Sequence, residues 1–334
     1  KNCDCEENFH LKMKRKKLTF LVFLNFVIIG KLFGAIFNLI GTNRSITATP
    51  FHSIEGAPYQ KCFSVCHYSP QCFSFEVSRS STFTGCLFYR QSYHESMTLL
   101  NKPGVTYHSL RIAKDCTELY QQGKRTNGVY EIYILGIYRK QLYCEMEIAG
   151  GGWMVFQRRF DGSIDFYNAD WDAYKEGFGD ASGEYWLGNK WLNLLTTSEK
   201  YDYLVWAKAF DGDTRMKKML GVRVENEDEG FKITFEQETQ DYSPNELYGM
   251  ERMNGAKFST VDTRNDVWSN AEGCAFRFGP WWHLMCHRVA MNGRYSHNGV
   301  ASSEANGIIW HDWKGYWTSL KESQIMIRPR SFNP

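Results

Sequence analysis

The fold of the larger part of this chain is decided by residues 150–189, which read GGGWMVFQRRFDGSIDFYNADWDAYKEGFGDASGEYWLGN. Three consecutive glycines begin this stretch, and because glycine has no Cβ atom they can turn the chain before the aromatic strand predicted from Trp153. At its other end, Asn189 is a suitable N-cap for a short helix through Leu195. A strand and a helix this close together predict a mixed α+β domain.

Further strands are predicted on both sides of this stretch. Short β-like runs at residues 129–134 and 142–147 precede it; they are punctuated by turn-forming glycines, and the second contains Cys144. A buried run at 201–210 and a shorter run at 232–235 follow it. The predicted fold class from residue 115 to residue 332 is therefore α+β.

Several ordered motifs carry a family resemblance. They are NGAKFST at residues 254–260, the Cys274 to Cys286 loop containing two tryptophans, NGRY at 292–295, and GIIW through WKGY at 307–316. With residues 150–189 they resemble the fibrinogen C-terminal domain of ficolins, tachylectin-type lectins, angiopoietins and the fibrinogen β and γ chains. The resemblance implies a disulfide-stapled domain at 115–332, with bridges Cys116–Cys144 and Cys274–Cys286.

Composition indicates the broad class of the chain. A length of 334 residues predicts about two domains, and the formal net charge of +2 argues against a nucleic-acid-binding protein, which would carry a basic face. All eleven tryptophans lie between Trp153 and Trp317. This change in composition predicts a domain boundary before Trp153.

The pattern of the first fifty residues predicts that the chain enters the secretory pathway. Met13 is a plausible start, and a basic cluster after it precedes the apolar run at residues 18–40. Residues 13–40 are interpreted either as a cleaved signal peptide or as a type II signal anchor, whereas a buried core helix does not suit the basic flank. Both interpretations place the glycosylation sequon at Asn43 outside the cell, and ten cysteines suit an oxidising compartment. The expected location is secreted, or type II membrane with an extracellular C-terminus.

A small cysteine-rich module is predicted at residues 51–112. Cys62 and Cys66 have the spacing of one helix face, and aromatic β-like runs follow Cys72 and surround Cys86. A metal site is the alternative, but paired CxxC spacing is absent from the sequence. The pattern resembles a PAN/apple domain, and that resemblance implies the bridges Cys62–Cys86 and Cys66–Cys72.

An enzyme is not expected, because the sequence has none of the common hydrolase, metalloprotease or nucleotide-binding motifs. Calcium is the candidate cofactor. The family carries two carboxylates in this loop, and Asp262 matches the first, but Arg264 replaces the second. Either Asp266 supplies the missing carboxylate, or the Arg264 guanidinium occupies the ion's place and pairs with both aspartates; a solvated acidic turn is the remaining interpretation.

The resemblance also implies a ligand pocket beside this loop. Phe278, His287, Ala305 and Tyr316 match its positions, whereas Glu304 stands where lectin relatives usually have tyrosine. From the residue alone, His287 is equally a packed histidine or a ligand contact. In lectin relatives the peptide bond before the second loop cysteine is cis, so we expect a cis Met285–Cys286 bond.

Two functions are compatible with these residues. The first is a non-enzymatic lectin of innate immunity that binds glycans or acetylated ligands. The second is an angiopoietin-like signalling or adhesion ligand that binds a cell-surface receptor protein, which Glu304 and Arg264 favour. The sequence contains no collagen-like repeat or heptad coiled coil before the domain, so an oligomer, which remains possible, would need another device.

Overall fold

The computed structural model describes residues 37–46, 48–69, 72, 74–79, 84–90, 100–110, 113–136, 138–241 and 249–333. The chain divides into two compact units, Lys1–Ile112 and Ala113–Pro334. Most of the predicted signal or anchor segment, residues 13–36, lies outside the described residues. Within the described ranges, no helix is both long and apolar enough to cross a membrane.

The first unit is an antiparallel sheet with a helix attached to it by disulfides. Its elements are β1 (Phe37–Ser45), β2 (His52–Glu55), α2 (Tyr59–Tyr68), β3 (Ser74–Arg79), β4 (Thr84–Tyr89) and β5 (Leu100–Leu110). The strand order is β1-β5-β3-β4-β2. Cys62 of α2 is bonded to Cys86 of β4, and Cys66 is bonded to Cys72. These are the two pairs that the sequence pattern implies.

The sheet of the first unit begins earlier than residue 51. Residues 37–40, assigned from sequence to the end of the apolar segment, lie in β1, which also contains Asn43 and pairs with β5. The buried Glu76 carboxylate holds the end of β1 in place, because it accepts hydrogen bonds from the Ser45 hydroxyl (2.6 Å) and the Ile46 N–H (2.9 Å). Tertiary pairing thus extends the module toward the N-terminus.

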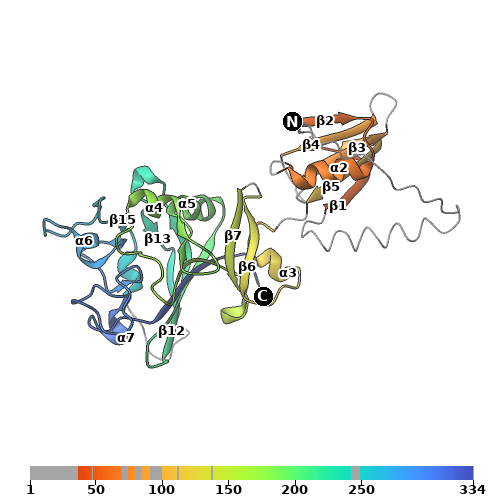
Figure 1. The fold of residues 1–334 in the computed structure, drawn as a ribbon. Coiled ribbons are helices and arrows are strands. Elements are labelled where there is room, and N and C mark those ends of the chain that lie inside the picture. The colour runs from red at the N-terminus through yellow and green to blue at the C-terminus, as the bar shows by residue number, and fades with distance from the viewer. Residues whose placement is uncertain are drawn as a thin grey trace, which may run out of the picture. The chain divides into compact units, whose positions relative to one another are not determined.

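The second unit is built on a large, mainly antiparallel sheet (Figure 1). The strands of its main path are β8 (Trp153–Arg159), β9 (Phe178–Gly179), β10 (Tyr185–Trp186), β11 (Tyr201–Lys208), β12 (Thr214–Val224), β13 (Ile233–Thr234) and β19 (Glu322–Pro329). Their order is β13-β12-β11-β19-β8-β10-β9. The strands β6 (Gly128–Ile134) and β7 (Tyr138–Glu145) form a hairpin, which joins the sheet by pairing of β7 with β8. Strand β14 (Gln237–Asp241) pairs with β12.

Short helices and small strand pairs complete this unit. The helices are α3 (Cys116–Gln121), α4 (Trp171–Glu176), α5 (Asn189–Ser198), α6 (Cys274–Phe278) and α7 (His311–Lys314), with 3-10 turns at Ile148–Gly150, Glu227–Glu229 and Met250–Met253. The small pairs are β15 (Lys257–Ser259) with β16 (Trp281–His283), and β17 (Val289–Ala290) with β18 (Ile309–Trp310). Disulfides join Cys116 to Cys144 and Cys274 to Cys286, again the expected pairs.

The deciding stretch folds largely as its residues predict. Gly151 and Gly152 have φ values of 68° and 71°, and β8 begins directly after them at Trp153. The helix also forms, but Asn189 is its first residue and Gly188 is the N-cap, so the predicted cap is wrong by one position. Gly188 has φ 114°, and a Cβ there would lie 2.6 Å from the Glu176 carbonyl oxygen, which leaves room only for glycine.

Aromatic packing links this core to the loop-rich end of the unit, where α6 and α7 lie far from the β6–β7 hairpin (Figure 1). The ring of Trp282 in β16 lies 5.0 Å from that of Phe258 in β15 and 5.8 Å from that of Trp186 in β10. All three side chains are buried. Strand β16 is therefore anchored by rings, and it fixes the residues that follow it.

Candidate functional site

The candidate site is built on the segment from α6 to His287. Helix α6 begins at Cys274, and the Cys274–Cys286 bridge ties its start to the residue before His287. Between the two cysteines, β16 pairs with β15 and has buried side chains throughout. The disulfide and the strand pairing together hold Phe278 and His287 on a fixed framework.

Three of the predicted ligand residues form an aromatic cluster, which we define as Phe278, His287 and Tyr316. The His287 ring lies edge-on to Phe278 at 5.2 Å and to Tyr316 at 6.3 Å between centroids. The Tyr316 hydroxyl donates a hydrogen bond to the His287 carbonyl (3.1 Å). Phe278 and Tyr316 are half-buried, so they present aromatic surface to solvent on either side of the histidine.

The two remaining predicted residues adjoin this cluster differently. The Ala305 N–H donates to the Tyr316 carbonyl (3.0 Å), and Ala305 is buried with a left-handed φ of 63°. Glu304 is exposed to solvent. The structure therefore brings Ala305 to the backbone of the cluster and leaves the Glu304 carboxylate in contact with water.

Burial keeps the histidines of this region neutral. Desolvation lowers the pKa of His283 from 6.5 to about 4, and its Nε2 lies 2.9 Å from the Gly279 carbonyl oxygen. Desolvation, with His283 next to it, lowers the pKa of His287 well below 6.5. A neutral imidazole between two aromatic rings suits an uncharged ligand group better than an anion.

Helix α7 positions Tyr316 through contacts that the sequence did not reveal. The Trp313 indole N–H donates to Asp213 (2.9 Å), and the Lys314 ammonium lies 2.7 Å from an Asp211 carboxylate oxygen. Asp211 and Asp213 belong to the turn between β11 and β12, about a hundred residues earlier in the chain. The only sequence signal for them was a turn after a strand.

The acidic loop, residues 262–268, is organised around a cation that belongs to the protein. The Arg264 guanidinium donates to the carbonyl of Ala271 (3.2 Å) and to that of Trp268, and its Nε lies 3.6 Å from the Asp266 carboxylate. Asp266 also accepts the N–H groups of Trp268 and Cys274, each at 3.1 Å. A carboxylate and two loop carbonyls are donors that calcium prefers, and here they face Arg264 instead.

Asp262 does not join this arrangement. It accepts hydrogen bonds from the Thr260 hydroxyl (2.7 Å) and the Trp171 N–H (3.0 Å). The expectation that Arg264 pairs with both aspartates is thus correct for Asp266 alone. Across the described ranges, no three His, Cys, Asp or Glu side chains are grouped to hold a metal ion. The residues present do not fit a calcium ion in this arrangement.

The expected cis bond before Cys286 is absent. Among the described residues no peptide bond is cis, so the Met285–Cys286 bond is trans. The chain turns instead at Cys286, whose φ is 62°. This left-handed residue gives the turn into His287, and His287 still contacts Phe278 and Tyr316.

The fold and motifs define the class of protein. Residues 112–330 match the family described as fibrinogen beta and gamma chains, C-terminal globular domain. The chain belongs to this family.

Curated relatives and solved structures agree with this assignment. Over 218 residues the chain is 37% identical to ryncolin-4 of Cerberus rynchops, with 65% of this chain and 61% of that protein covered. It is 38% identical over 223 residues to fibrinogen C domain-containing protein 1 of Mus musculus, with 64% and 46% covered. The chain thus spans about half the length of these relatives.

Two solved structures share the fold. The fibrinogen-like globe domain of human ANGPTL6 is 33% identical with a TM-score of 0.61, covering 66% of this chain and 96% of that one. Lamprey fibrin D-dimer, complexed with the peptide Gly-His-Arg-Pro-amide, is 27% identical with a TM-score of 0.60, covering 67% and 76%.

Proposed function

We propose that this chain is an extracellular, non-enzymatic recognition protein whose second unit binds an acetylated glycan, or another acetylated ligand, at the aromatic cluster. The observation that carries the proposal is the half-buried His287, whose enclosed ring nitrogens have a pKa lowered by desolvation and whose ring lies between those of Phe278 and Tyr316. Aromatic faces accept an acetyl methyl group, and nearby backbone groups supply polar contacts for the amide. Membership of a family that includes lectins supports the same function.

The proposal is tested by ligand binding with a matched pair of variants. N-acetylglucosamine and glucosamine are titrated against the full chain by calorimetry. Phe278→Ala should weaken the acetylated sugar about tenfold or more, since it removes one aromatic wall. The control is Phe276→Ala, which removes an exposed ring two residues earlier in α6. Equal binding of the two sugars, or an equal loss in both variants, would overturn the acetyl-binding function.

The proposal includes the expectation that ligand binding does not require calcium. Arg264 supplies the positive charge of the acidic loop, so calcium binding at Asp262 and Asp266 should be weak and ligand binding should not need it. The contacts of Arg264 with Asp266 and two loop carbonyls support this. Titration of the acetylated sugar in the presence of a chelator should give unchanged affinity, and loss of binding would contradict it.

A second candidate function is docking on a cell-surface receptor protein. Exposed apolar side chains favour it: Val267, Phe276 and Met285 are 69%, 53% and 74% exposed, and Val267 is hydrogen-bonded to the Leu284 carbonyl beside them. Exposed apolar side chains of this kind are typical of protein interfaces. Met285→Ser should abolish cell binding while leaving acetylated-sugar binding intact if this function is correct, and unchanged cell binding would exclude it.

The first unit is proposed to be a PAN/apple-like module. A helix bonded by Cys62–Cys86 and Cys66–Cys72 to an antiparallel sheet supports it. Secretion through residues 13–40, anchoring through 18–40, glycosylation at Asn43 and oligomerisation are likewise proposals. Enzymatic deglycosylation of the secreted protein, followed by mass spectrometry of its N-terminus, tests the first three together.

A further inference from the structure

A hollow of about 380 Å³ lies in the fibrinogen-like unit and is lined by none of the residues of the aromatic cluster. It is lined by the loop that follows β8, residues 162–167, and by the loop that follows β17, residues 293–297. Both loops belong to the motifs singled out in the sequence, FDGSIDFY and NGRY, which the aromatic cluster does not use. Its volume is within the range of small-molecule sites.

The floor of this hollow is rigid and internally paired. The buried Arg159 guanidinium donates to the carbonyls of Gly293 (2.9 Å) and Met291 (3.3 Å), and its Nε lies 3.8 Å from the buried Glu184 carboxylate. Glu184 in turn accepts three consecutive backbone N–H groups, the first from Phe160 (2.6 Å). These contacts join the two loops before any ligand arrives, so the site is preorganised.

The wall of the hollow combines an arginine, a carboxylate and rings. The exposed Arg294 guanidinium stacks over the Tyr167 ring at 3.8 Å from its centroid and interacts electrostatically with the exposed Asp165. The half-buried Tyr295, which also lines the hollow, has its ring centroid 5.2 Å from that of His297. The hollow thus offers hydrogen-bond donors, acceptors and an aromatic edge within one small volume.

The charges of the hollow occur in matched pairs, and this decides the class of ligand. Arg159 is paired with Glu184, and Arg294 interacts electrostatically with Asp165, whose carboxylate also accepts hydrogen bonds from Tyr167 and Asn168. An anion would be repelled by Asp165 and a cation by Arg294, whereas a neutral polyhydroxyl ligand can donate to the first and accept from the second. We propose that this hollow binds a neutral pyranose ring of a glycan, without requiring an acetyl group.

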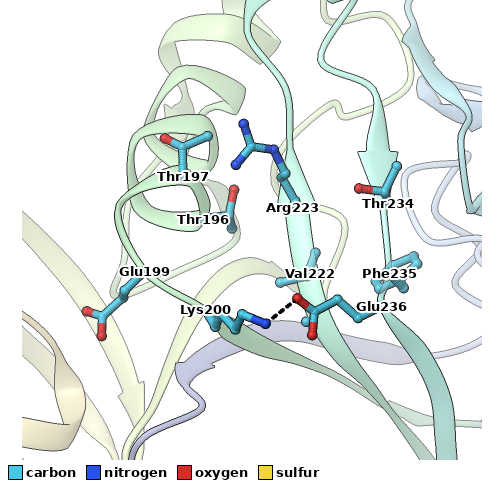
Figure 2. Close-up of a pocket in the computed structure, with 10 residues that line it drawn as sticks. Thr196, Thr197, Glu199, Lys200, Val222, Arg223, Thr234, Phe235 and Glu236 are labelled. Carbon is cyan, nitrogen blue, oxygen red and sulfur yellow. Dashed lines mark ion pairs between the residues drawn. The ribbon is translucent and has the colours of Figure 1, made fainter.

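A different hollow in the same unit provides the contrast. It has about 320 Å³ and lies between the end of α5 and strands β12 and β13 (Figure 2). There the Lys200 ammonium is paired with Glu236 at 2.7 Å, and Arg223 is bound to Glu225 at 2.8 Å. Its aromatic residue, Phe235, is as buried as Tyr167 is in the first hollow, and it has no counterpart to the half-buried Tyr295 ring. This hollow offers threonine hydroxyls and ion pairs but no accessible ring, so it lacks the surface on which a sugar packs.

The test uses methyl glycosides of galactose, glucose and mannose, which carry no acetyl group. Saturation-transfer NMR on the full chain should detect at least one of them. Arg294→Ala should weaken that glycoside about tenfold, because it removes a donor and the stacked cation together. Asp165→Asn, which keeps the shape of the side chain, should weaken it less.

Two controls separate this site from the aromatic cluster and from misfolding. Arg223→Ala removes an exposed, carboxylate-paired arginine from the other hollow, and Phe278→Ala removes a wall of the aromatic cluster. Neither should change glycoside binding, and all variants should remain folded at the temperature of the binding measurement. No detectable binding of any glycoside, an equal loss in Arg223→Ala, or a loss in Phe278→Ala would overturn the proposal. The last result would assign the sugar to the aromatic cluster and leave the proposed function intact.

Discussion

The aromatic cluster and the acidic loop lie at the two ends of α6 and are stabilised in opposite ways. In the cluster, the rings of Phe278 and Tyr316 pack edge to face against the half-buried His287. In the acidic loop, a charged guanidinium joins a carboxylate to two carbonyls. The aromatic cluster depends on desolvated, uncharged rings, and the acidic loop depends on the attraction between opposite charges. They should therefore respond differently to acid, salt and substitution.

Acid should have the largest effect, and it should act on His283, whose ring contacts His287 of the cluster. The native pKa of His283 is about 4 against 6.5 unperturbed, so between these pH values the unfolded state binds more protons than the native state. The free energy of unfolding should therefore fall as pH falls from about 6.5 to about 4, by up to about 3 kcal/mol. Urea unfolding at pH 7 and pH 4.5 measures this.

The matched variant for this experiment is His283→Gln, which retains a donor for the Gly279 carbonyl but does not titrate in this range. Its unfolding free energy should change less with pH than that of the wild type. An identical pH dependence in both proteins would show that other groups cause the acid response.

Removal of Asp266 should have the next largest effect. Asp266→Ala deletes the acceptor of two backbone N–H groups and the partner of Arg264, at a cost of about 2 to 3 kcal/mol. Asp262→Ala is the control, because that side chain is exposed and should cost about 1 kcal/mol or less. Urea midpoints for both variants decide the order, and a greater loss at Asp262 would contradict the described role of Arg264.

Removal of the arginine itself should matter less. Arg264 is 40% exposed, so water screens its ion pair, and Arg264→Ala should cost about 1 kcal/mol. The same variant measured in 1 M sodium chloride should differ less from the wild type, since salt weakens the exposed pair. A difference that does not change with salt would indicate lost packing in place of lost charge.

The smallest effect should follow from conversion of the loop to a metal site. Arg264→Asp replaces the cation with a second carboxylate, so millimolar calcium should raise the melting temperature of the variant by about 1 to 3 °C. Calcium should leave the wild type unchanged. Tight calcium binding by the unaltered protein in calorimetry, not improved by the substitution, would show that Arg264 does not replace the ion.

Sequence reasoning succeeded where local chemistry decides the structure. The positive φ angles before Trp153 and the helix after Gly188 follow from residue type, and the four cysteine pairs are those that the two family resemblances imply. The contact of His287 with Phe278 and Tyr316 was implied by the family motifs.

Sequence reasoning failed where the partner of a side chain is set by residues that are distant in the chain. Arg264 contacts Asp266 and not Asp262, because Asp262 is held by the N–H of Trp171, which precedes it by about ninety residues. The bond between Trp313 and Asp213 spans a similar distance in the chain. The requirement for glycine at position 273 also depends on the assembled loop, since a Cβ there would lie 3.1 Å from Arg264 Cδ. None of these choices can be made before the loops are assembled.

The uneven distribution of tryptophan has an optical consequence. All eleven indoles belong to the second unit, and Trp186, Trp281 and Trp282 are buried in its core. Tryptophan fluorescence, excited at the red edge of the indole absorption band, will therefore report the unfolding of the fibrinogen-like unit. It will not report the unfolding of the cysteine-rich unit. Far-ultraviolet circular dichroism observes both. A mismatch between the two signals would reveal directly, without labels, whether the two units melt independently.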